Sequence, residues 1–230
     1  MTNYEREVTK IIEQARFQVT TERFVELFIK DWTFQHCGLF PLTSEEVELC
    51  KRYDLETSFK ALSHIIFMEG VVKGVTDPIG FLFNEFSNKS KSNAYFPTPS
   101  EVSSLLIELI LPQEQIVKPS TFSEPCGGTG SIILTKLEKI YFRNIELEDP
   151  LRGMHFHVEE IDPLLCRVLF LQFLFKCQHL QMVGGKPANP SSFVIQNIDV
   201  ISRREGSVHF YMTSPDFEES RNKVALESVA

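Results

Sequence analysis

The feature that most constrains this chain is a glycine-rich stretch, Glu124-Pro125-Cys126-Gly127-Gly128-Thr129-Gly130, which we call the glycine loop. A short β-prone run that starts at Thr121 precedes it, and a stretch with the apolar spacing of a helix starts at Ser131. Glycines here let the backbone turn tightly and approach a ligand closely, beside the positive end of a helix. A strand, a glycine loop and a helix in this order predict an α/β fold with a ligand site at the loop.

Short strands and helices alternate around this loop. We expect strands over residues 121–125, 154–160, 193–198 and 208–212, and helices over 102–111, 131–141 and 163–176. Strands separated by helices of this length indicate a parallel, doubly wound sheet. Residues 1–90 show helical spacing of apolar residues, and a polar run at 88–93 ends them. We therefore expect a helical N-terminal lobe over 1–90 and an α/β domain over 91–230.

The charge balance limits how the chain could handle nucleic acid. It carries 31 acidic and 23 basic side chains, a formal net charge of −8. A protein that holds DNA through a broad basic surface usually has a surplus of Lys and Arg. We therefore expect any DNA binding to be weak for this chain alone and to need a partner.

Cysteine usage and the N-terminus favour a cytoplasmic location. The five cysteines form no CxxC pair and leave one thiol over in any disulfide scheme. The charged N-terminus has no apolar stretch behind it, so we expect no signal peptide and no membrane span. His155 and His157 stand two apart on a strand, but no third ligand lies nearby in sequence, and we assign no metal site.

Three kinds of nucleotide site use glycine loops, and the spacing separates them. A phosphate loop needs a Lys after the last glycine, where Ser131 stands. A dinucleotide loop needs a third glycine where Ile133 stands, and an acid about 20 residues on, whereas Glu160 lies 36 residues after Glu124. A ligand without a pyrophosphate, held by the loop and by ribose hydroxyls on Glu160, is the remaining interpretation, and S-adenosylmethionine fits it.

Three ordered motifs resemble a known family. They are Phe96-Pro97-Thr98-Pro99, the glycine loop, and Val158-Glu159-Glu160-Ile161-Asp162-Pro163. In this order they resemble the motifs of amino-group DNA methyltransferases, and most of all the modification subunits of type I restriction enzymes. Residues 77–86 are similar to the segment before the first motif, so the resemblance covers about residues 77–217.

The resemblance implies a Rossmann-like methyltransferase fold, which we expect to be truncated after the fourth strand, and S-adenosylmethionine as cofactor. The Pro99 segment would cover the methionine end, Glu160 would bind the ribose, and Asp199 would lie near the adenine amino group. The full set of implied cofactor-binding residues is Phe96, Thr98, Pro99, Glu124, Pro125, Cys126, Gly127, Gly128, Gly130, Glu160, Ile161 and Asp199.

The family's catalytic tetrapeptide, Asp, Asn or Ser followed by Pro-Pro and an aromatic residue, corresponds here to residues 214–217. Ser214, Pro215 and Phe217 match it, and Asp216 replaces the second proline. In the family, the side-chain oxygen and a backbone carbonyl accept the N–H bonds of the target amine, while the ring stacks on the flipped base. Only 13 residues follow Phe217, so the strands that complete a methyltransferase sheet are absent from this sequence.

Two hypotheses follow. The first is S-adenosylmethionine-dependent methyl transfer to adenine N6 or cytosine N4 in DNA, with a partner that supplies DNA specificity. The second is a catalytically degenerate relative that binds the cofactor or a partner in a restriction-modification system. The expected partner is a specificity subunit, a second methyltransferase fragment or a homodimer mate.

Overall fold

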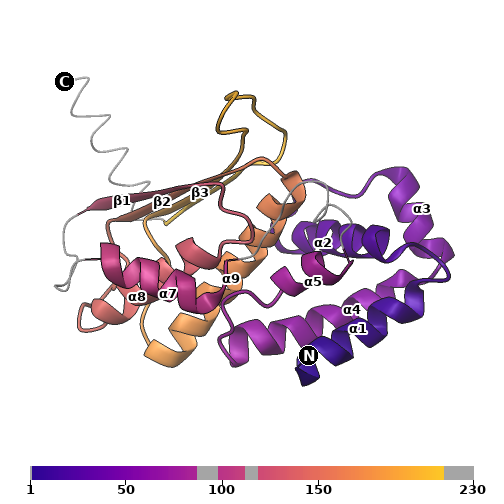
Figure 1. Cartoon of the computed structure of the whole chain (residues 1–230), viewed down its shortest axis with the longest axis horizontal. Helices are drawn as coiled ribbons and strands as arrows, with labels where there is room; N and C mark the ends of the chain where they lie inside the picture. Colours follow the sequence, from indigo (N-terminus) through magenta and orange to yellow (C-terminus); the bar gives the residue numbers. More distant parts are fainter. Residues whose placement is uncertain (1, 87–97, 112–118, 215–230) are drawn as a thin grey trace.

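The computed structural model describes residues 2–86, 98–111 and 119–214 (Figure 1). The first part is helical, as predicted for the N-terminal lobe. Threonine side chains at positions 2, 20 and 43 accept backbone N–H groups at the starts of the first three helices, because an N-cap oxygen satisfies a donor that has no partner within the helix. The elements are α1 (Asn3–Ala15), α2 (Thr21–Cys37), α3 (Ser44–Arg52), α4 (Leu55–Phe67), the π-helical turn η1 (Met68–Val72) and α5 (Gly80–Phe86).

The second part is an α/β unit with a mostly parallel sheet, which confirms the predicted class. β1, β2 and β3 are parallel neighbours, and each predicted strand and helix is found, although α9 runs to Gly184 rather than ending at 176. The elements are α7 (Ser100–Ile110), β1 (Ser120–Pro125), α8 (Ser131–Arg143), β2 (Met154–Glu160), α9 (Pro163–Gly184), β3 (Ser192–Asn197) and β4 (Phe210–Thr213).

The expectation of a doubly wound parallel sheet is wrong in two respects. The strand order is β1-β2-β3-β4, and β4 runs antiparallel to β3. A parallel neighbour needs a crossover, usually a helix, and no helix lies between β3 and β4, so the chain returns antiparallel. Because the order of β1, β2 and β3 never reverses, α8 and α9 cover the same face of the sheet (Figure 1).

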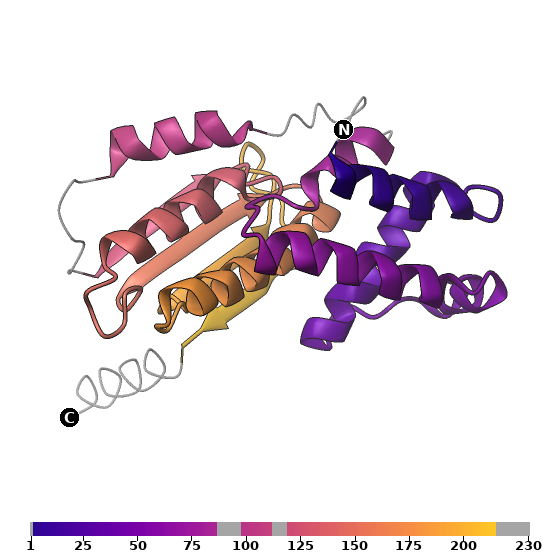
Figure 2. The same ribbon diagram turned by 90° about the horizontal axis from the view of Figure 1, so that it is seen from below.

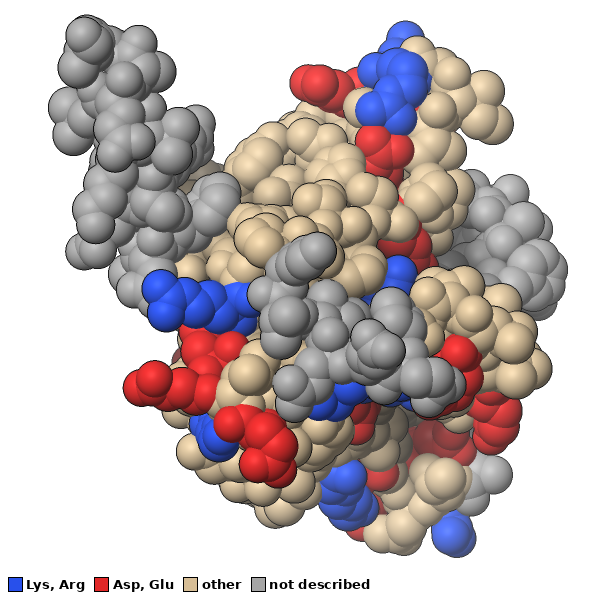
Figure 3. Space-filling view, turned by 90° about the vertical axis from the view of Figure 1, so that its left-hand side faces the viewer, with Lys and Arg blue, Asp and Glu red and all other residues tan. Residues whose placement is uncertain are grey.

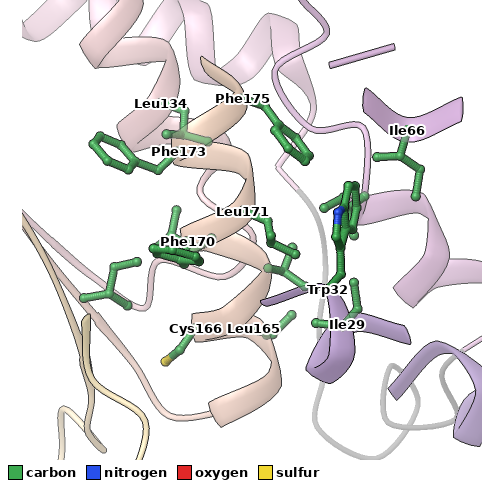
Figure 4. Close-up of a cluster of buried hydrophobic side chains, with 14 of the residues drawn as sticks. Ile29, Trp32, Ile66, Leu134, Leu165, Cys166, Phe170, Leu171, Phe173 and Phe175 are labelled. Atoms are coloured by element: carbon green, nitrogen blue, oxygen red, sulfur yellow. The ribbon is translucent and has the colours of Figure 1, made fainter. Parts of the chain in front are cut away.

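Helix α9 lies at the centre of a core that the helical lobe and the sheet share. Apolar residues lie on every side of it, as expected for a helix that is buried for most of its length, and Arg167, Gln172 and Lys176 are buried among them. Towards the sheet, the Phe173 ring stacks on Phe193 of β3 with centroids 4.0 Å apart. Towards the lobe, Phe175 meets Trp32 of α2 at 5.1 Å (Figure 4). The two parts of the chain therefore pack as one hydrophobic cluster.

One buried cation ties the lobe to α9 and α8. The side chain of Lys176 is 1% exposed, and its Nζ lies 2.7 Å from Oε2 of Glu138 on α8. The same ammonium donates to Oγ1 of Thr76, at 3.0 Å, in the segment that links η1 to α5. A buried charge is tolerated when it is paired and its remaining protons have acceptors, and Lys176 meets both conditions.

Candidate ligand-binding site

The glycine loop turns sharply from β1 into α8. The N–H of Gly127 donates to the carbonyl of Glu159 on β2 at 2.9 Å, and the N–H of Gly130 donates back to the Gly127 carbonyl at 2.8 Å. Gly128 and Gly130 have φ values of 56° and 95°, in the left-handed region that glycine adopts at no cost. Cys126 adopts the same region at 62°, which is uncommon for a residue with a side chain.

Two glycines of the loop are required by packing. A Cβ on Gly127 would lie 2.1 Å from Cγ1 of Val158 on β2, and one on Gly130 would lie 2.2 Å from Cδ1 of Leu169 on α9. Both neighbours are fully buried. The loop therefore sits tightly against β2 and α9, which fixes the direction of its N–H groups.

Glu160 at the end of β2 faces this loop, as expected. Its residue is 6% exposed, and its two carboxylate oxygens accept the N–H of Gly128 and the N–H of Asp162, each at 2.8 Å. Burial raises the pKa of Glu160, and the backbone N–H groups of Asp162, Gly128 and Ile161 oppose that rise. A carboxylate has about four acceptor positions, and these three donors leave about one for a ligand.

The Thr98–Pro99 segment also reaches the loop. The hydroxyl of Ser131, the first residue of α8, donates to the carbonyl of Thr98 at 3.1 Å and lies 3.0 Å from the hydroxyl of Ser103 on α7. Three motifs that are far apart in the sequence therefore meet at the N-terminus of α8. Phe96 of the first motif lies outside the described residues.

A buried polar cluster, which sequence reasoning did not assign to the site, holds the loop in place. Oδ2 of Asp77 accepts the hydroxyl of Thr129 at 2.7 Å, and Oδ1 accepts the N–H of Gly80 at 2.8 Å. Gln172 of α9 accepts the N–H of Ile79 and donates to the Thr129 carbonyl. The signal for this cluster was Gln172, a polar residue inside an otherwise apolar run.

Glu124, the first residue of the glycine loop, lies in an apolar setting. Its Oε2 is buried and has no hydrogen-bond partner among the residues that the structure describes. Burial raises the pKa of Glu124 to about 7, against the opposing effects of Lys136 and of the Ile133 N–H. Near neutral pH this carboxyl is therefore poised between its two protonation states.

Replacement of Glu124 by Gln is expected to remove a pH dependence of stability. The folded pKa is about 7 against an ordinary 4.5, so the folded protein holds a proton that the unfolded chain releases between these values. Wild-type stability should then fall relative to Glu124→Gln by up to about 3 kcal/mol as pH rises from 4.5 to 7, and level off above. Urea unfolding of both proteins across this range measures the difference, and two curves that stay parallel would refute the assignment.

Two further residues of the predicted set lie at the same end of the sheet. Ile161 follows Glu160 and is 63% exposed, so its apolar side chain is free to contact a ligand. Asp199 follows β3, where the N–H of Ile198 donates to the Glu160 carbonyl at 2.9 Å. The Asp199 carboxylate is occupied by its own turn, because it accepts the Ser202 hydroxyl at 2.6 Å and the Ile201 N–H at 2.9 Å.

The predicted catalytic position is not brought to this site. The N–H of Ser214 donates to the carbonyl of Ser191 at 3.1 Å, just before β3 begins. Glu160 lies beside the other end of β3, where it is in register with Asn197. The antiparallel direction of β4 therefore places Ser214 at the end of the sheet opposite the glycine loop, and Pro215 and Phe217 lie outside the described residues.

Figure 3 shows acidic and basic side chains intermixed on the face in view, with no wide basic area. Within the described part of the chain, no helix is long and apolar enough to cross a bilayer, and no three or more metal-binding side chains gather. Comparison with protein-family models, curated proteins and solved structures gave no match to this chain.

Proposed function

We propose that this chain binds S-adenosylmethionine at the glycine loop and is a methyltransferase-like protein. The observation that carries the proposal is the meeting of three motifs at the N-terminus of α8. Gly128 and Glu160 are joined there by a 2.8 Å hydrogen bond, and Thr98 is joined to Ser131 by one of 3.1 Å. This end of a parallel sheet, beyond the carboxyl ends of its strands, is where α/β proteins bind their ligands.

The charge at the loop favours this cofactor over a nucleoside phosphate. A phosphate would normally take the loop N–H groups, but the Glu160 carboxylate already accepts the N–H of Gly128. Asp77 and Glu124 add two more carboxyl groups around the loop; burial raises the pKa of both, and Glu124, with a pKa of about 7, is partly ionised near neutral pH. Such surroundings repel a phosphate and suit a ligand whose reactive centre is a sulfonium cation.

The neighbouring groups suit an adenosine. The remaining acceptor position of Glu160 suits a hydroxyl of a ribose. Exposed Ile161 offers an apolar surface to an adenine ring, and Asp199, on the next strand end, would accept its amino group after a change of rotamer. Under this proposal the Thr98–Pro99 segment covers the methionine end, as the family resemblance implies.

The position of Ser214 favours the second hypothesis, a cofactor-binding relative without a complete catalytic site of its own. Methyl transfer to adenine N6 or cytosine N4 needs the accepting amine in line with the methyl group, within about 3.5 Å. Ser214 lies across the sheet from the loop, and Asp216 departs from the family's proline. We infer that the chain acts with a partner in a restriction-modification system and that this partner supplies DNA specificity.

Replacement of Glu160 by Gln tests the cofactor site. The amide keeps the size of the side chain but loses charge and one acceptor group, so S-adenosylmethionine should bind about 10- to 100-fold more weakly. The matched control is Glu159→Gln, because the carboxylate of Glu159, one residue away, is occupied by an ion pair with Arg203 at 2.8 Å. Calorimetric titration gives both affinities, and equal losses in the two variants would contradict the role of Glu160.

A methyl-transfer assay separates the two hypotheses. We expect the wild-type chain to bind labelled S-adenosylmethionine but to transfer no methyl group to DNA when it is alone. Transfer by the isolated chain that is lost in Ser214→Ala would restore the enzymatic hypothesis. Transfer that survives Ser214→Ala would assign the chemistry to other residues.

A further inference from the structure

Helix α7 carries an apolar stripe that nothing in the proposed function uses. Ser103 and Ile107 face α8 and are fully buried, and Ser104 and Glu108 line the hollow between α7 and α8. The opposite flank is apolar and exposed, with side chains 41–74% accessible. This α7 stripe consists of Val102, Leu105, Leu106, Leu109 and Ile110.

Strand β1 beside it is an open edge of the sheet. The N–H of Ser120 donates towards β2, to the Gly153 carbonyl at 2.9 Å, so alternate backbone groups at Thr121 and Ser123 point away from β2. The backbone of Pro125, two residues after Ser123, faces the same way as that of Thr121 and Ser123. Proline has no N–H, and it is tolerated on the unpaired side of an edge strand. Among the described strands none pairs with this side of β1; Pro125 blocks pairing only at the end of the strand, and Thr121 and Ser123 carry no Lys and no bulge that would prevent it.

These two features lie on the same side of the molecule. Figure 2 shows α7 as the outermost helix beyond α8, and α7 is the described element that precedes β1 in the sequence. A strand added to β1 would extend the sheet towards α7. The edge supplies hydrogen-bonding groups and the α7 stripe supplies apolar surface, which is the combination that strand addition requires.

We propose that two copies of this chain associate through β1 and the α7 stripe. An interface of standard size needs about 800 Å² from each partner, and a helix of about 16 Å cannot supply this alone. Antiparallel pairing of β1 with β1 of a second copy adds a contact about 20 Å long and brings the two α7 stripes to the same side of one continuous sheet. The stripe holds no charge, so two acidic chains, each of net charge −8, meet where their repulsion is smallest.

Sedimentation of the full chain over a range of micromolar concentrations tests this. We expect a species of twice the 26.4 kDa of one chain. Leu105→Glu with Leu109→Glu should give a monomer, and Ser123→Pro, which removes an outward N–H, should raise the dissociation constant about tenfold or more. Ile201→Glu, at a site 92% exposed elsewhere, is the matched control and should remain a dimer.

Circular dichroism confirms that each variant is folded, as expected for exposed positions. A wild-type chain that stays monomeric overturns the proposal, whether or not a different protein later binds this surface. A dimer that neither the α7 nor the β1 variant weakens places the interface elsewhere and also overturns it. Open-ended polymers would overturn it as well, because a two-fold contact closes on itself.

Discussion

Lys176→Ala is expected to lower the free energy of unfolding by about 3 kcal/mol. The substitution leaves Glu138 without the ammonium that lies 2.7 Å away, and it removes a donor from Thr76. It also takes the apolar stem of the lysine out of the interface between α9 and the helical lobe. Urea unfolding measures the loss, and the single tryptophan, Trp32, reports on this interface because it contacts the adjacent Phe175.

A double-mutant cycle shows whether the effect comes from the ion pair. Lys176→Met combined with Glu138→Gln replaces both charges and should cost less than the sum of the single variants. Lys60→Ala is the control, since Lys60 pairs with Glu56 on the surface with both side chains more than 70% exposed. A loss below about 0.5 kcal/mol is expected there, and a similar small loss for Lys176→Ala would contradict the stabilising role of the buried Lys176 ammonium.

Gly130→Ala is expected to destabilise the protein by about 3 kcal/mol. Its Cβ would lie 2.2 Å from Leu169, which is fully buried, so the core must shift to accept it. Its φ of 95° adds backbone strain, because a side chain disfavours this region. Thermal unfolding should show the loss, and S-adenosylmethionine binding should weaken with it because the loop moves.

Gly185→Ala separates the cost of the steric contact with Leu169 from the cost of the backbone strain. Gly185 also has a left-handed φ, 66°, but no atom lies within 4 Å of an added Cβ. We expect only the backbone cost of about 1 kcal/mol there. If both alanine variants lose the same free energy of unfolding, the result contradicts the close packing of Gly130 against Leu169.

The sequence was sufficient to predict the elements and the class of fold. Strong local signals explain this success: Pro163 stands at the first turn of α9, Thr43 caps α3, and glycines separate β1 from α8. The meeting of Thr98, the glycine loop and Glu160 was also predictable, because motif order indicated it. Each of these inferences depended on residues close together in the sequence or on a fixed order of motifs.

The antiparallel direction of β4 was missed although the sequence carries a signal for it: only residues 199–207 separate the expected strands 193–198 and 208–212, too few for the crossover that a parallel neighbour needs. Strand alternation says nothing about which edge a fourth strand joins, and the choice depends on long-range contacts such as Phe210 against Phe170, with ring centroids 4.5 Å apart. The Asp77–Thr129–Gln172 cluster is a similar case, since its members are separated by 43 to 95 residues. The contacts within such a cluster can be identified only once the packing of the helices that carry its members is known.

The most direct test of the central claim is hydrogen exchange of the wild-type chain with and without S-adenosylmethionine. The cofactor, if bound as proposed, should slow exchange in peptides that cover the glycine loop and residues 158–162, and leave β4 unchanged. NAD and ATP, which carry phosphates, should cause no such protection. Absence of protection at the loop, or equal protection by ATP, would contradict the account.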